Sequence, residues 1–195
     1  MELKNDIQTF YAKDANAWRN WLQKNHRSEK SVWLIIYKKE CKKPSVYYNE
    51  AVDEALCFGW IDSKPNKRDE ESYYQFFAKR NPKSNWSKVN KAKVEKLIKE
   101  KKMARAGLEA IETAKQNGTW HALDEVDNSI VPADLTKALL KNKTAMKNFE
   151  SFPKSSKKII LEWINNAKKE ETRLKRIEET VSLAAKNIRA NHYRQ

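Results

Sequence analysis

The sequence has little of what breaks a chain into loops and little of what binds metals or forms disulfides. Its 195 residues include three Gly, five Pro, two Cys and three His. So few glycines and prolines exclude a loop-rich or collagen-like protein. Two cysteines are too few for a disulfide scaffold, and the three histidines lack the spacing of a zinc site. We therefore expect a mostly helical protein with neither a metal nor another cofactor.

Long hydrophobic runs are also absent. No stretch approaches the roughly 20 apolar residues that cross a bilayer, and the opening residues MELKND contain no apolar signal core. The sequence therefore predicts no membrane span and a cytoplasmic location. Disorder is not expected, because seven Trp, seven Tyr and six Phe supply apolar surface to bury. Nothing in the residues indicates an oligomeric state.

Negative charge is scarce relative to positive charge, since 26 Asp and Glu accompany 40 Lys and Arg, a formal net charge of +14. The excess lies in two segments, where eleven basic residues accompany two Glu (residues 79–105) and five Glu (residues 154–195). Such charge attracts anions, whether a small molecule, an acidic protein or nucleic acid. The alternative is an ordinary solvated surface, because Lys outnumbers Arg.

The pattern of apolar residues predicts an α+β protein. Three runs rich in β-branched and aromatic residues indicate a small antiparallel sheet with helices around it: 32–37, 60–64 and 73–78. Beyond the third run the apolar period becomes helical and stays so to the end of the chain. We therefore expect an α+β region over residues 1–83 and an all-helical region over 84–195, packed as one unit.

Three residues are predicted to mark the ends of helices. Asp14 is expected to cap the first helix, because its carboxylate can accept a hydrogen bond from a free backbone N–H group. Gly59 is expected to end the helix before the second strand, because glycine adopts the left-handed conformation found there. Ser84 is the predicted cap of the helix that follows the third strand.

The strand after Gly59 carries the first candidate site. Alternation along a strand would place Trp60, Asp62 and Lys64 on one face. These residues could form one wall of a ligand-binding site, but they are equally typical of the solvent-exposed face of an ordinary strand. Glu54 on the preceding helix could approach Asp62, and a carboxylate pair can divide acid and base roles. A salt bridge between Asp62 and Lys64 is the favoured alternative.

The connection between the third strand and the next helix is the second candidate. A helix start presents N–H groups to anions, while Arg80 adds charge and Trp86 a stacking face. The segment lacks the glycines of a phosphate-cradling loop, and a capped helix after a basic loop is the alternative. We predict one concave ligand site lined by Trp60, Asp62, Lys64 and Arg80, with Asn85 and Trp86 at its edge.

The two thiols are expected to differ. Cys57 lies in the last turn of a helix between apolar residues, which disfavours a thiolate and indicates a core cysteine. Cys41 is surrounded by Lys39, Lys42 and Lys43 in a predicted loop, a setting that favours the thiolate. We therefore predict that Cys41 is the reactive thiol. No histidine base adjoins it in the sequence, so catalysis is not implied.

Several motifs, in this order, resemble the YdeI/OmpD-associated (OmdA-like) bacteriocin-protection family. They are EALCFGWID at 54–62, SNWSKVN at 84–90, MARAGLEA at 103–110, GTW at 118–120 and AKKEETRLKRI at 167–177. The resemblance covers roughly residues 32–185. It implies a link to tolerance of bacteriocins and cationic peptides, and it supplies no settled activity and no catalytic residues.

Three functions remain open. The leading hypothesis is a non-enzymatic protein of stress tolerance that binds an anionic small molecule or an acidic partner. The second is a non-specific nucleic-acid-binding module that uses residues 79–105. The third is a hydrolase-type enzyme that uses Glu54 and Asp62. The first ranks highest because the motifs contain no recognisable nucleophile, base or metal set.

Overall fold

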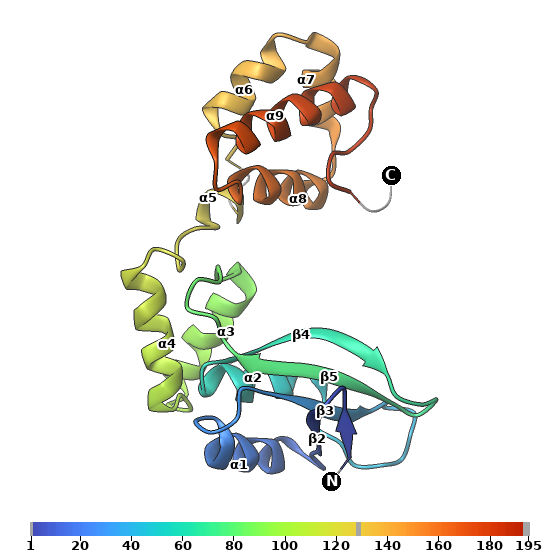
Figure 1. Cartoon of the computed structure of the whole chain (residues 1–195), viewed down its shortest axis with the longest axis vertical. Helices are drawn as coiled ribbons and strands as arrows, with labels where there is room; N and C mark the ends of the chain where they lie inside the picture. The colour runs from blue at the N-terminus through green and yellow to red at the C-terminus, as the bar shows by residue number, and fades with distance from the viewer. Residues whose placement is uncertain (1, 128–129, 193–195) are drawn as a thin grey trace. The chain divides into compact units, whose positions relative to one another are not determined.

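A computed structural model describes residues 2–127 and 130–192 (Figure 1). Contacts divide the chain into two units, residues 1–121 (unit 1) and residues 122–195 (unit 2). Each unit has its own cluster of buried apolar residues. The predicted fold class is confirmed, because the sheet lies in unit 1 and the elements described in unit 2 are all helices.

The described part of unit 1 contains five strands and four helices. Along the chain they are β1 (Leu3–Lys4), β2 (Ile7–Tyr11), α1 (Ala15–Asn25), β3 (Ser31–Tyr37), α2 (Tyr48–Cys57), β4 (Trp60–Lys67), β5 (Ser72–Lys79), α3 (Lys88–Lys99) and α4 (Arg105–Gln116). The strands form one sheet in the order β1-β2-β3-β5-β4. The three predicted strands are β3, β4 and β5, and β5 pairs antiparallel with both of the others.

The sheet is mixed rather than purely antiparallel. β2 pairs in parallel with β3, and α1 supplies the crossover connection that a parallel pair requires. β1 extends the sheet beyond β2 as an antiparallel strand of two residues. The sequence analysis predicted neither of these strands, because β1 is very short and β2 mixes polar and apolar residues without a long β-branched run.

One face of the sheet forms the core of unit 1 together with α1 and α2. Alternate residues of β3, among them Val32, Leu34 and Ile36, belong to this core. Trp18 of α1 contacts Phe77 of β5, with ring centroids 5.3 Å apart. Trp18 also stacks on Trp21 at 5.2 Å. Large aromatic side chains therefore supply much of the apolar surface that holds the helices on the sheet.

Two of the three predicted helix ends are confirmed. The Asp14 carboxylate accepts a hydrogen bond from the Ala17 amide at 2.7 Å, and Gly59 has a φ angle of 72° just beyond α2. The third prediction was wrong by one turn, because α3 begins at Lys88 and its cap is Ser87, which accepts from the Asn90 amide. Ser84 instead donates to the Asn81 carbonyl, in the turn that contains Pro82.

The first helices after the sheet pack into unit 1. Buried residues of α3 and α4, including Val94, Leu97, Ile111 and Ala114, belong to the same core as the sheet. β5 ends at Lys79 and α3 begins at Lys88, so the first part of the helical region expected over 84–195 lies in unit 1. The boundary between packed units instead follows residue 121.

Unit 2 is a helical bundle with a separate core. Its helices are α5 (Asp124–Asp127), α6 (Ala133–Leu140), α7 (Lys143–Ser151), α8 (Lys154–Asn165) and α9 (Glu170–Ala185). The core contains Leu135 and Leu139 of α6, Phe149 of α7, Ile160 of α8 and Ile177 of α9. Within residues 2–127 and 130–192, no helix is both long enough and apolar enough to cross a membrane.

Candidate functional site

The alternation predicted for residues 60–64 breaks after Asp62. Trp60 lies opposite Lys79 and Asp62 opposite Phe77, but Pro65 lies opposite Gln75. β4 therefore contains one residue more than β5 between these pairs, which is a β-bulge. An extra residue reverses the alternation beyond it, so Lys64 does not share the face of Trp60 and Asp62.

Of the residues predicted to form a binding wall, Trp60 belongs to the core, whereas Asp62 is half-buried and Lys64 is exposed. Trp60 is only 1% exposed, meets Trp21 edge-on at 5.9 Å and directs its Nε1–H toward the His26 carbonyl at 3.4 Å. Asp62 accepts a hydrogen bond of 2.7 Å from the Tyr48 hydroxyl, which replaces the salt bridge expected with Lys64. From the sequence, a binding wall and an exposed strand face were both open; at Trp60 neither holds, because α1 covers the start of the strand.

The two candidate catalytic carboxylates have separate partners. Glu54 forms a 2.6 Å ion pair with Arg19 of α1, and Asp62 is bonded to Tyr48. Within the part of the chain that the structure describes, no hydrogen bond joins Glu54 to Asp62. No cluster of three or more His, Cys, Asp or Glu suited to a metal ion occurs among those residues either.

Arg80 is half-buried against the core. Its guanidinium lies 3.9 Å from the centroid of the Trp86 ring and donates to the Asn85 carbonyl. Trp86 is 1% exposed and packs against Trp120 at 5.1 Å. Burial lowers the pKa of Arg80 to about 10, and its Nε is buried without a hydrogen-bond partner among the described residues. Arg80 therefore covers the ring of Trp86, which the sequence analysis expected to be a stacking face for a ligand.

A different group of cationic side chains does converge on one pocket. The pocket, called here the basic pocket, has a volume of about 280 Å³. It is lined by Arg19, Gln23, His26, Arg27, Phe58, Ala104, Arg105 and Ala106. These residues come from α1 and its end, from the residue after α2, and from the start of α4. Three guanidinium groups and an imidazole beside one pocket would favour a ligand of negative charge.

Phe58 orders one wall of the basic pocket. Its ring lies 5.3 Å from the Arg19 guanidinium and 5.2 Å from the His26 ring. Arg19 also donates to Glu54 and, at 2.7 Å, to the Lys102 carbonyl. This side chain is therefore held by several contacts before any ligand binds, which lowers the entropy lost on binding.

The other two arginines are freer. Arg105 is exposed and donates to Glu109 within the same helix at 2.7 Å, a type of surface pair that contributes little to stability. Arg27 is exposed, and within residues 2–127 and 130–192 its guanidinium has no hydrogen-bond or ion-pair partner. Both guanidinium groups can therefore reorient toward a bound anion.

The start of α4 adds partial positive charge to the basic pocket. Ala104 occupies the N-cap position, and no side chain caps the helix. The first N–H groups of a helix have no intrahelical partner and attract anions. α4 is 12 residues long, so its dipole reinforces the charge of Arg27 and Arg105.

Two glycines fix α4 against the end of α2. A Cβ atom on Gly107 would lie 2.3 Å from the Cys57 carbonyl oxygen, and one on Gly59 would lie 3.0 Å from the Ala106 carbonyl oxygen. The Ala104 amide donates to the same Cys57 carbonyl at 3.0 Å. The backbones of the two helices thus touch, which places Phe58 beside residues 104–106.

The thiols differ in burial. Cys57 is fully buried, and burial raises the pKa of its thiol to about 11. This agrees with the interpretation of Cys57 as a core cysteine. Cys41 is partly exposed and unpaired with Cys57. The greater reactivity of Cys41 stays a prediction.

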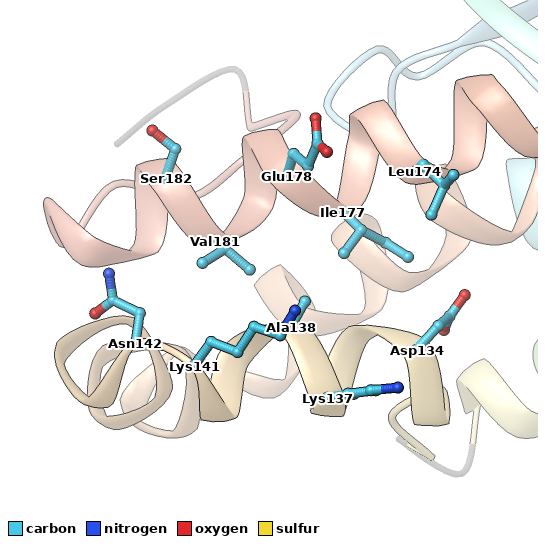
Figure 2. A pocket seen from close by; sticks show the side chains of 10 residues that line it. All are labelled: Asp134, Lys137, Ala138, Lys141, Asn142, Leu174, Ile177, Glu178, Val181 and Ser182. Carbon is cyan, nitrogen blue, oxygen red and sulfur yellow. The ribbon is translucent and has the colours of Figure 1, made fainter.

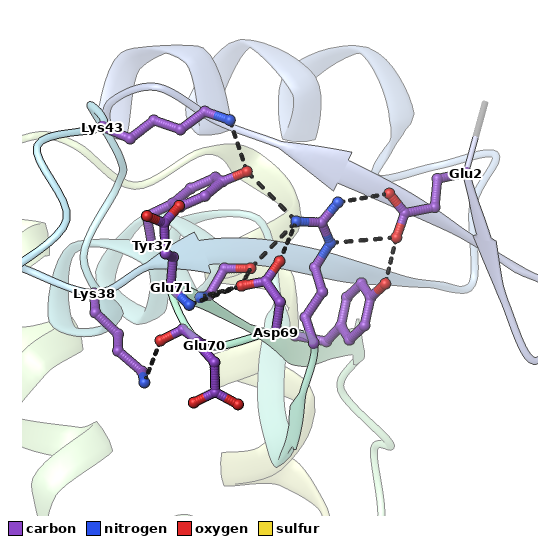
Figure 3. A network of polar contacts seen from close by, with 10 residues as sticks. Glu2, Tyr37, Lys38, Lys43, Asp69, Glu70 and Glu71 are labelled. Atoms are coloured by element: carbon purple, nitrogen blue, oxygen red, sulfur yellow. Dashed lines mark hydrogen bonds and ion pairs between the residues drawn. The ribbon is translucent and has the colours of Figure 1, made fainter.

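A network of charged groups ties the β4–β5 loop to the first strand (Figure 3). Arg68 contacts both carboxylate oxygens of Glu2 and pairs with Asp69 at 2.9 Å. Asp69 in turn accepts from the Ser72 amide at 2.7 Å. The hydrogen bond from Arg68 is the main cause that lowers the pKa of Glu2. Because these charges neutralise one another, we assign the network a structural role.

Unit 2 has a groove between two of its helices (Figure 2). This groove, called here the α6/α9 groove, has a volume of about 590 Å³. Its lining residues are Asp134, Lys137, Ala138, Lys141, Asn142, Leu174, Ile177, Glu178, Val181 and Ser182. Figure 2 shows Leu174, Ile177 and Val181 of α9 directed toward α6, where Lys137 and Lys141 lie.

The comparisons with known proteins divide the chain in the same way. Residues 10–110, slightly more than half of the chain, match the family model described as Domain of unknown function (DUF8412). The chain belongs to the DUF8412 family. The DUF8412 match lies entirely within unit 1 and includes every residue that lines the basic pocket.

A second family model matches outside the DUF8412 region. Residues 128–187 match the model described as Bacteriocin-protection, YdeI or OmpD-Associated, and the described part of this match contains the α6/α9 groove. The resemblance stated from the sequence is thus confirmed for this part of the chain only. No curated protein and no solved structure matches the chain.

Most of the motifs behind that resemblance lie in the DUF8412 region. The first three motifs, at 54–62, 84–90 and 103–110, fall within its residues 10–110, whereas AKKEETRLKRI at 167–177 falls in the second match. The structure gives the first and third motifs a shared role, because Cys57 and Gly59 of one contact Ala106 and Gly107 of the other.

Sequence reasoning missed the basic pocket of the DUF8412 region. Its charged residues are separated by up to 86 positions, from Arg19 to Arg105, and no local motif links them. A weak signal was present, since Arg27 follows the end of a predicted helix and Arg105 lies inside MARAGLEA. Only the contact between α2 and α4 brings these residues together.

Proposed function

We propose that this protein acts by binding rather than by catalysis, and that the basic pocket of unit 1 holds an anionic small molecule. The observation that carries the proposal is the convergence of Arg19, His26, Arg27 and Arg105 on one pocket beside the uncapped start of α4. Guanidinium groups match phosphate and carboxylate groups with pairs of parallel hydrogen bonds. A volume of about 280 Å³ suits a small ligand.

The family matches set the wider context of the proposal. The match of residues 128–187 to a bacteriocin-protection family supports a protective role, which we attribute to the whole chain. In this proposal, binding of a ligand in the basic pocket of unit 1 regulates the protective role or is a part of it. Arg80 lies on Trp86 outside the basic pocket, and it stays a separate candidate contact for an anion because its buried Nε has no partner among the described residues. Trp60 would support the basic pocket from the core, through its contact with the His26 carbonyl.

Nucleic-acid binding remains the second candidate. It is disfavoured because carboxylates neutralise part of the basic segment 79–105. Lys93 pairs with Asp53, and both Lys96 and Lys102 pair with Glu100. A generic DNA duplex should therefore bind weakly at most, with an affinity that falls steeply as salt is raised.

Isothermal titration of the full chain tests the anion site, with inorganic phosphate, pyrophosphate and citrate as probes. Arg27→Ala and Arg105→Ala should each weaken binding of the best probe by at least about tenfold, since a hydrogen bond to a charged group contributes about 1.5–3 kcal/mol. Lys30→Ala is the matched control, because it removes one exposed positive charge close to Arg27 but outside the pocket.

Two results would contradict the proposal. Failure of the wild-type protein to bind any of the three probes would remove the basic pocket as an anion site. An equal loss for Lys30→Ala and Arg27→Ala would show that the protein attracts anions through its net charge alone. The melting temperature of each variant should stay within about 2 °C of the wild type, because exposed charges contribute little to folding.

A further inference from the structure

The α6/α9 groove runs along both of its helices. On α9 the lining residues Leu174, Ile177, Glu178, Val181 and Ser182 follow the three- and four-residue spacing of one helix face. On α6 the lining residues Asp134, Lys137, Ala138 and Lys141 do the same. The stretch from Leu174 to Ser182 is about 12 Å long at 1.5 Å per residue. The groove is therefore an elongated channel between two parallel stripes of side chains.

The floor of the α6/α9 groove is apolar and open to solvent. Leu174 is 52% exposed, and Val181 and Ala138 are partly exposed above the buried Ile177. Exposed aliphatic side chains of this size beside a groove indicate a surface that a partner covers.

The two walls carry opposite charges. Asp134 is already engaged, since Arg173 donates to its two oxygens at 2.6 and 3.0 Å. The α6 wall is therefore left with Lys137 and Lys141, one turn apart. The α9 wall presents Glu178. Within residues 2–127 and 130–192, none of these three side chains has an ion-pair partner.

We infer that the α6/α9 groove binds an amphipathic helix of another protein. An apolar stripe on that helix would cover Leu174, Val181 and Ala138, while glutamate or aspartate residues on one flank would meet Lys137 and Lys141. A basic residue on the other flank would meet Glu178. An amphipathic helix in a groove between two helices is a recurring mode of recognition, and it uses residues at the spacing seen here.

The test uses the full chain and a designed probe. The probe is a fluorescein-labelled helical peptide of 16 residues, with leucines along one face, glutamates along one flank and a single arginine on the other. A peptide of the same composition in scrambled order is its control. Fluorescence anisotropy should show the designed peptide binding at least tenfold more tightly than the scrambled one.

Charge reversal then locates the site. Lys137→Glu/Lys141→Glu should weaken binding of the probe at least tenfold, because like charges across an interface are strongly disfavoured. A second probe with lysines in place of the glutamates should regain affinity for this variant. Lys147→Glu/Lys154→Glu makes the same change in net charge at exposed sites on α7 and α8, and it should leave binding unchanged.

Three outcomes would overturn the inference. Equal affinity for the designed and scrambled peptides, including no binding of either, would exclude recognition of a helix. Equal weakening by both double variants would show that only net charge matters. If the wild-type chain self-associates in sedimentation and Lys137→Glu/Lys141→Glu abolishes this, the occupant is a second copy of the chain. Val181→Asp puts a charge on the apolar floor of the groove. Its effect on binding of the designed peptide tests the same site without a change to Lys137 or Lys141.

Discussion

Replacing Gly107 with Ala tests whether backbone contact between α2 and α4 determines the fold of unit 1. Gly107 lies inside α4, where alanine is normally favoured over glycine by about 1 kcal/mol. In this structure the new Cβ would lie 2.3 Å from the Cys57 carbonyl oxygen and 2.7 Å from Met103 Cε. Met103 can move, but the carbonyl belongs to the backbone. The helices must therefore separate.

The expected magnitude follows from three contributions. Overpacking costs about 1–3 kcal/mol, and a contact with backbone lies at the upper end of that range. Separation also breaks the hydrogen bond from Ala104 to Cys57, which contributes about 1 kcal/mol. After the helix propensity of alanine is subtracted, we expect Gly107→Ala to destabilise unit 1 by about 3 kcal/mol.

Urea unfolding followed by tryptophan fluorescence measures this change. Six of the seven Trp lie in unit 1, so the signal reports mainly on that unit. A loss of 3 kcal/mol should lower the urea midpoint by about 1.5 M for a slope of about 2 kcal/mol per molar urea. Gly118→Ala is the control, because φ there is +81° but no atom lies within 4 Å of the added Cβ. It should cost only the left-handed strain of about 1–2 kcal/mol. A Gly107→Ala protein as stable as the wild type would refute the reasoning.

Two further predictions concern titratable side chains. In timed labelling of the native protein with a thiol reagent, Cys41 should react much faster than Cys57, because Cys57 is buried and its thiol has a pKa of about 11; equal rates would contradict this. Burial and the hydrogen bond to Asp62 raise the pKa of Tyr48 to about 12 from about 10 in the unfolded chain. The folded state therefore binds the phenol proton more tightly, and its contribution to stability is complete below pH 10 and declines between pH 10 and 12. Tyr48→Phe should flatten that decline in urea midpoints measured from pH 9 to 11.5, and an unchanged slope would show that Tyr48 is not its source.

Local signals in the sequence predicted local structure well. The helix cap at Asp14 and the helix end at Gly59 were predicted correctly, because a cap and a left-handed turn depend on single residues and their neighbours. The β-bulge after Asp62 has no comparable signal, since an extra residue is defined by the partner strand. The one extra residue of this bulge was enough to place Lys64 on the other face of the strand.

The candidate site was harder to predict because burial depends on distant parts of the chain. Trp60 and Trp86 look like ligand-stacking residues in isolation, but α1 and Trp120 cover them. Arg80 lies on Trp86 for the same reason. The basic pocket depends on three segments that meet only after α4 packs on α2, so no local window contains it.

The shape and the charge of the basic pocket depend on different residues. The glycine contact between α2 and α4 determines the shape. The frame rests on backbone atoms at Cys57, Ala106 and Gly107, where nearly any larger side chain would disrupt packing. Two of the charges come from Arg27 and Arg105, whose exposed side chains contribute little to folding. Evolution, or a protein engineer, can therefore alter the preferred anion of such a pocket by surface substitutions while the frame remains unchanged.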